Sequence, residues 1–246
     1  MKKLLLITLA LYTQLLFCAT SEQVEQYLSI SQAEEELLSL ESQFSAMQNG
    51  FSARTDEEDK TYDMQLLSIR FNEYIEKNLS ENEMDSILQN YKNVIFLQFI
   101  SALSDNNYEK NASALYVTTL QDNPEANTRI NLVEKISKKI NNKEAIIIMF
   151  DELIKPLIEN SKGGDKLGDT YLKNRKESYL KTMLLAAKNK TFLAAKDFSI
   201  EELEVLLEVA QTPAMGYEIK AVSAATAYAL RDFFLSMASR YDISKH

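Results

Sequence analysis

The chain has 246 residues, with 27 basic and 36 acidic side chains, which give a formal net charge of −9. This negative balance offers no electrostatic attraction for phosphate backbones, so nucleic acid is excluded as an expected partner. Five glycines, three prolines and no tryptophan argue against an all-β protein, which needs frequent turns.

Residues 1–19 are predicted to be a secretory signal peptide, because two lysines precede an apolar run of 14 residues and small residues follow it. The run is too short to span a bilayer as a helix. We expect cleavage between residues 19 and 21; the alternative is a lipoprotein anchored through Cys18, where Phe17 is an unusual neighbour. Beyond the signal peptide the net charge is −11, from 25 basic and 36 acidic side chains, and no apolar run is long enough for a transmembrane segment. We therefore expect a periplasmic or secreted protein.

The rest of the chain is predicted to be all-α, with eight or nine helices, because apolar residues recur every three or four positions. Four S/T-x-x-E capping boxes predict helix starts at Ser31, Thr55, Ser80 and Ser199. Pro156 is expected to kink or end its helix. The expected helices are 22–48, 55–78, 81–104, 107–121, 125–141, 143–160, 167–195, 200–211 and 214–241.

An internal repeat is also predicted, because residues 78–104 align without a gap to residues 197–223 at an offset of 119, with six identities. Upstream, residues 24–44 resemble residues 133–153 at a similar offset. We therefore expect a duplicated multi-helix bundle, in which a first helical repeat (22–123) packs on a second (124–246).

The acidic clusters are interpreted as solvated helix faces. On a helical projection Glu201, Glu204 and Glu208 fall opposite the leucines of the same segment, which predicts a solvent-facing stripe. The single histidine, His246, is the last residue, so histidine-based metal sites and catalytic triads have no member. We predict no catalytic residue, no metal ligand and no cofactor.

Two apolar segments are candidates for a binding role. Residues 94–103 are apolar nearly all round, which indicates either a central buried helix or the lining of an apolar ligand groove. Residues 214–241 mix small residues with large ones near the end of the chain, which indicates close helix packing or a face for a partner. The candidate residues for an apolar groove or partner face are Phe96, Phe99, Ile100, Phe233, Phe234 and Met237.

The chain resembles a bacterial exported family known as a domain of unknown function, numbered twenty fifty-nine, in two copies. The similarity lies in a first amphipathic helix and in an acid-capped helix that leads to a Thr-Pro segment, carried by Ser199, Glu202, Leu203, Thr212, Pro213 and Gly216. The resemblance implies an all-α exported protein and supplies no catalytic residue.

Two functions follow as hypotheses. The first is a non-catalytic binding or interaction module of the cell envelope, whose partner is an envelope protein or an apolar small molecule. The alternative is a carboxylate-dependent hydrolase of an envelope glycan, which requires two carboxyl groups about 5 to 10 Å apart. A purely structural role for the bundle stays open.

Overall fold

The all-α prediction is confirmed by a computed structural model, which describes residues 18–33, 37–39, 42, 66–104, 112–121 and 126–238. No strand occurs in these ranges, where β-structure is limited to an isolated bridge between Cys18 and Ser80. The elements are α2 (Ser21–Ser31), α4 (Leu66–Asn78), α5 (Glu81–Asn90), α6 (Val94–Ser104), α7 (Ala112–Gln121), α8 (Asn127–Ile140), α9 (Lys143–Met149), the π-helical turn η2 (Phe150–Ile154), α10 (Lys155–Glu159), the 3-10 turn η3 (Gly164–Lys166), α11 (Asp169–Ala194), α12 (Ile200–Ala210) and α13 (Pro213–Ala238).

Capping boxes begin three of these helices. Ser80 and Ser199 each accept a hydrogen bond from the backbone N–H three residues on, and the glutamate at that position accepts one from the cap's own N–H, as predicted. Thr20 forms the same box with Gln23 at the start of α2, where glutamine takes the place of the glutamate in the S/T-x-x-E pattern. Most of the predicted signal peptide lies outside the described residues. Because Thr20 caps α2, cleavage after residue 21 would remove this cap.

Two predicted helix boundaries need correction. The predicted helix 22–48 is interrupted at Gln32, whose left-handed conformation with φ 61° ends α2 at Ser31. The Ser31 hydroxyl accepts a hydrogen bond of 3.3 Å from the N–H of Ala33, where helical structure resumes, and Glu34, the other member of the predicted box, lies outside the described residues. The predicted helix 81–104 is broken after Asn90, and Asn93 then accepts a hydrogen bond of 3.2 Å from the N–H of Phe96 in the first turn of α6. The predicted start at Thr55 lies outside the described residues.

Pro156 neither ends its helix nor interrupts the helical path. The chain passes from α9 through η2 into α10, so the residues just before the proline form a π turn. A π turn changes the register of the backbone hydrogen bonds, which accommodates a residue that lacks an N–H. The segment 145–150 is helical, as expected.

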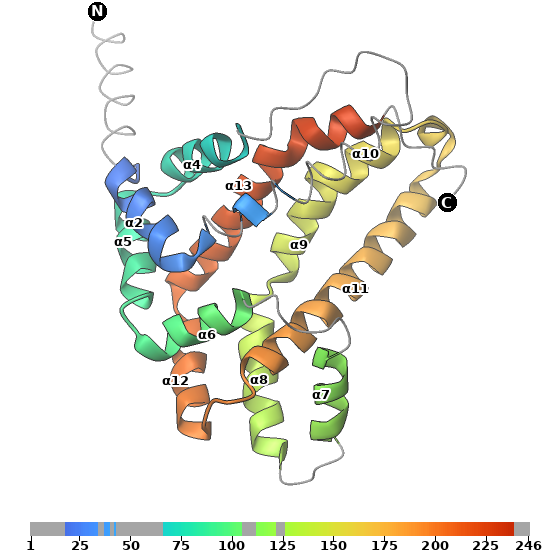
Figure 1. Cartoon of the computed structure of the whole chain (residues 1–246). Coiled ribbons are helices and arrows are strands. Elements are labelled where there is room, and N and C mark those ends of the chain that lie inside the picture. The colour runs from blue at the N-terminus through green and yellow to red at the C-terminus, as the bar shows by residue number, and fades with distance from the viewer. Residues whose placement is uncertain are drawn as a thin grey trace, which may run out of the picture.

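The helix α13 runs through the middle of the molecule, with α2, α4 and α5 to one side and α9, α10 and α11 to the other (Figure 1). It packs against α4, α5, α8, α9, η2 and α10. Small residues along α13, such as Ala221, Ala225 and Ala229, are buried and allow these neighbours to approach closely. One hydrophobic core extends from α2 to α13 and so includes both predicted repeats.

The helix pairs α5–α6 and α12–α13 begin at corresponding positions of the predicted repeat. Adding the offset of 119 to Glu81 and Val94, which begin α5 and α6, gives Ile200 and Pro213, which begin α12 and α13. The second helix of each pair therefore begins 13 residues after the first, although α13, with 26 residues, is longer than α6, with 11.

The two pairs also contact each other reciprocally, since α5 packs against α13 and α6 packs against α12. Their turns meet where the side-chain N–H of Asn90 donates a hydrogen bond of 3.0 Å to the hydroxyl of Thr212. These features agree with duplication of 22–123 and 124–246, which stays a prediction.

Candidate functional site

Glu218 is a buried carboxyl group on the central helix. It lies on the stripe of α13 that carries Met215 and Ala225, and only 7 % of its surface is exposed. Carboxyl groups are rarely buried in this way without a compensating partner. The position of Glu218 therefore requires an account of what each of its oxygens contacts.

Two tyrosine hydroxyls donate to the same oxygen of Glu218. The hydroxyl of Tyr27, on α2, lies 3.0 Å from Oε1, and the hydroxyl of Tyr91, the residue that follows α5, also donates to Oε1. The rings of Tyr27 and Tyr91 meet edge to face, with centroids 5.9 Å apart. Elements distant in the sequence thus converge on one carboxyl group.

Burial raises the pKa of Glu218 to about 7, while the hydrogen bonds from Tyr91 and Tyr27 act in the opposite direction because they favour the charged form. Burial, together with the neighbouring Glu218 charge, also raises the pKa values of Tyr27 and Tyr91 well above the ordinary value of 10. Both tyrosines therefore remain hydrogen-bond donors throughout the physiological range, whereas Glu218 changes its charge near neutrality.

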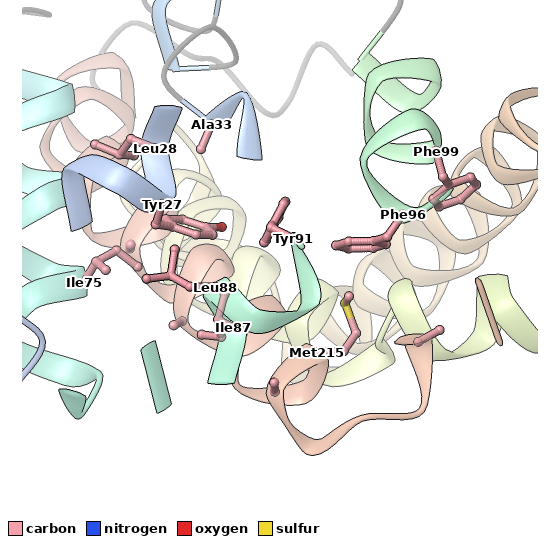
Figure 2. Close-up of a cluster of buried hydrophobic side chains, with 14 of the residues drawn as sticks. Tyr27, Leu28, Ala33, Ile75, Ile87, Leu88, Tyr91, Phe96, Phe99 and Met215 are labelled. Carbon is pink, nitrogen blue, oxygen red and sulfur yellow. The ribbon is translucent and has the colours of Figure 1, made fainter. Parts of the chain in front are cut away.

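The second oxygen of Glu218, Oε2, is buried and has no hydrogen-bond partner among the described residues. Glu218, Tyr27 and Tyr91 line a cavity of about 200 Å³. The apolar wall of this cavity comes mainly from Phe96, Phe99 and Ile100 of α6 and from Met215, Ile219 and Val222 of α13. In Figure 2 the rings of Tyr27, Tyr91, Phe96 and Phe99 follow one another across the cluster, and Met215 lies beside them. We call this space the Glu218 cavity.

Three of the six candidate residues from the sequence lie at the Glu218 cavity. Phe96 and Phe99 are almost fully buried, Ile100 is half-buried, and all three line the cavity, so α6 is both a core helix and a cavity wall.

The other three candidates lie elsewhere. Phe233 is 15 positions after Glu218 on α13, which corresponds to roughly 22 Å along a helix. These three side chains do not form the exposed face for a partner that was considered from the sequence. Phe233 is fully buried, and Phe234 and Met237 are half-buried and packed on the core. The helix α4 packs against α13, and its Arg70 forms an ion pair of 2.8 Å with Asp232, next to Phe233.

The sequence analysis missed Glu218, Tyr27 and Tyr91. A signal for Glu218 was present, because it occupies the apolar stripe three residues after Met215 and seven before Ala225. Its partners could not be found in this way, since Tyr91 is 127 residues away and Tyr27 is 191 residues away.

The acidic stripe of α12 is solvent-exposed, as predicted for Glu201, Glu204 and Glu208. Within the described ranges, no three His, Cys, Asp or Glu side chains form a group that could hold a metal ion. Two further cavities lie near Asn141; one contains Glu134 as its single carboxylate and the other contains none. The described residues thus bring no second carboxylate into the cavity that contains Glu218.

Comparison with known proteins gives no relative: no family model matches the chain, and neither the curated proteins nor the solved structures contain a match. Among the helices that the structure describes, none has both the length and the apolar character needed to cross a membrane.

Proposed function

We propose that this protein is an exported binding module of the cell envelope that holds a small, mostly apolar molecule in the Glu218 cavity. The observation that carries the proposal is the buried Oε2 of Glu218, which faces no donor from the described chain although apolar side chains surround it. A buried acceptor without a partner costs free energy, and such groups are normally satisfied by a ligand or a bound water.

The size of the cavity sets the size of the ligand. A dry apolar cavity of about 150 Å³ in another protein is large enough to bind benzene. The Glu218 cavity has about 200 Å³. A substituted benzene ring or a short branched alkyl compound therefore fits, whereas a drug-sized ligand would need a larger opening.

Export is proposed from the predicted signal peptide and from the resemblance to an exported family of unknown function. The alternative, a glycan hydrolase with two carboxyl groups, has no support in the described cavities, because neither Glu218 nor Glu134 shares its cavity with a second carboxylate. We therefore favour binding over catalysis.

The proposal can be tested by methyl NMR on the purified protein during titration with toluene and benzyl alcohol. Saturable shifts are expected at the methyl groups of Met215 and Ile219, which face the cavity. Val222→Phe places a ring in the cavity and should abolish these shifts, whereas Leu235→Phe, on an exposed position of the same helix, should preserve them. Equal shifts in both variants, or no saturable shift, would show that the cavity holds at most water.

A further inference from the structure

The two oxygens of the Glu218 carboxyl group have different surroundings. Oε1 accepts hydrogen bonds from both Tyr27 and Tyr91, whereas Oε2 is buried without a partner in the described chain. The tyrosines orient the carboxyl group and leave Oε2 without a donor from the described residues. A ligand that satisfied Oε2 would have to present a hydrogen-bond donor to it.

No positive charge from the described part of the chain balances this carboxylate. The ion pairs between described residues do not include Glu218, and the described lining of its cavity contains no Lys, Arg or His. A cationic ligand would thus supply a counter-charge in an apolar site and would meet no like charge there.

Aromatic rings surround the same space. The rings of Tyr91 and Phe96 lie 5.1 Å apart at 62°, Tyr27 packs edge to face on Tyr91, and Phe99 is a further member of the lining. The faces of such rings attract ammonium groups, and aromatic cages are a common recognition site for organic cations. Neutral apolar ligands also favour aromatic walls, so the rings alone do not select a cation. The rings and the buried carboxylate of Glu218 together favour a cationic ligand over a neutral one.

We infer that the ligand of the Glu218 cavity is a small apolar molecule with a protonated amine, which donates a hydrogen bond to Oε2 and lies against the rings of Tyr91 and Phe96. This inference rests on the proposed binding function and adds the chemical class of the ligand. The tyrosine hydroxyls hold the carboxyl group, and the wall of α6 and α13 encloses the apolar body.

The test is isothermal titration calorimetry of the purified protein at pH 8 with benzylamine and with benzyl alcohol, which have the same shape and differ in charge. Benzylamine should bind at least about tenfold more tightly, because hydrogen bonds to charged groups are stronger than those between neutral groups. Glu218→Gln should remove this preference while retaining binding of the alcohol. Glu204→Gln, which removes the same charge from an exposed position on α12, should leave the preference unchanged.

The outcomes separate the two proposals. Equal binding of amine and alcohol would overturn the inference and leave the binding function intact. A preference for the amine that persists in Glu218→Gln would also overturn it, because the charge would then be recognised elsewhere. Failure of both probes to bind at millimolar concentration would overturn the inference and count against the proposed function as well.

A pH series provides a second readout. Of the described residues that line the cavity, Glu218, Tyr27 and Tyr91 titrate, and burial holds both tyrosine pKa values above the range tested. Since the pKa of Glu218 is about 7, its charged fraction in the unliganded protein rises about thirtyfold between pH 5.5 and pH 8. The affinity for benzylamine should rise to the same extent, whereas that for benzyl alcohol should stay constant. Parallel pH profiles for the two probes would refute the inference.

Discussion

Glu218→Gln should stabilise the protein, and the gain should grow with pH. In the folded state the pKa of Glu218 is about 7, against an ordinary value of 4.5. Between these two values the folded protein keeps its proton while the unfolded chain has released it, so this group lowers stability as the pH rises and the loss is complete above pH 7. Glutamine has the same shape, stays neutral at every pH and can still accept the hydrogen bonds from Tyr27 and Tyr91.

The magnitude follows from the difference between the two pKa values. Each tenfold change in proton affinity corresponds to about 1.4 kcal/mol, so ionising Glu218 costs the folded state about 3 kcal/mol at high pH. About 1 kcal/mol of this loss is already present at pH 5, so the advantage of Glu218→Gln over the wild-type protein should increase by roughly 2 to 3 kcal/mol between pH 5 and pH 8.5.

The assay is urea unfolding of both proteins at pH 5, 6, 7 and 8.5, in which contributions from other titrating groups cancel. Glu204→Gln serves as the control, because it removes an exposed charge and its stability difference should not follow the same curve. A difference between Glu218→Gln and wild type that is constant with pH, or that favours the wild type at pH 8.5, would refute the reasoning that Glu218 is a buried, uncompensated carboxyl group.

Three further substitutions test the packing and capping of the fold away from the Glu218 cavity, each by urea unfolding. Phe233→Ala should lower the free energy of unfolding by about 3 to 5 kcal/mol because its ring is fully buried, whereas the control Leu235→Ala, at an exposed position, should lower it by less than about 1 kcal/mol. Similar losses of stability in the two variants would contradict the described core. Arg129 donates to the carbonyl oxygens that follow α11, at 3.1 and 2.7 Å, so Arg129→Met should cost about 2 kcal/mol and the exposed Arg175→Met about 0.5 kcal/mol. Ser199→Ala should cost about 1 kcal/mol through loss of the cap on α12, and a neutral result would argue against the capping box.

The sequence predicted the elements whose causes are local. The starts of α5 and α12 were found because the residues of each capping box are three positions apart and directly precede an amphipathic run. The break between α5 and α6 was missed because Leu88, Tyr91 and Val94 keep a helical spacing across it, although Lys92 and Asn93 are polar. The feature that marks the start of α6 is the hydrogen bond that Asn93 accepts from Phe96. The π turn before Pro156 was also missed, since the periodicity on both sides is helical.

Part of the candidate site was also predicted, because that part depends on a local pattern in the sequence. The apolar character of α6 is visible in its sequence, so Phe96, Phe99 and Ile100 were found, although the sequence could not separate core from cavity wall. Glu218 depends on tertiary packing, because the two tyrosines that hold its carboxyl group come from other parts of the chain. Local patterns can indicate an acid in an apolar stripe, but they cannot show what it contacts.

The most direct test of the binding site is ¹³C NMR of the carboxyl carbon of Glu218, titrated with and without benzylamine and assigned through Glu218→Gln. We predict a pKa near 7 in the unliganded protein, because the group is buried. With benzylamine bound, the pKa should fall, because a cation beside Oε2 favours the charged form. An ordinary pKa near 4.5, or a pKa that benzylamine leaves unchanged at saturation, would contradict the site described above.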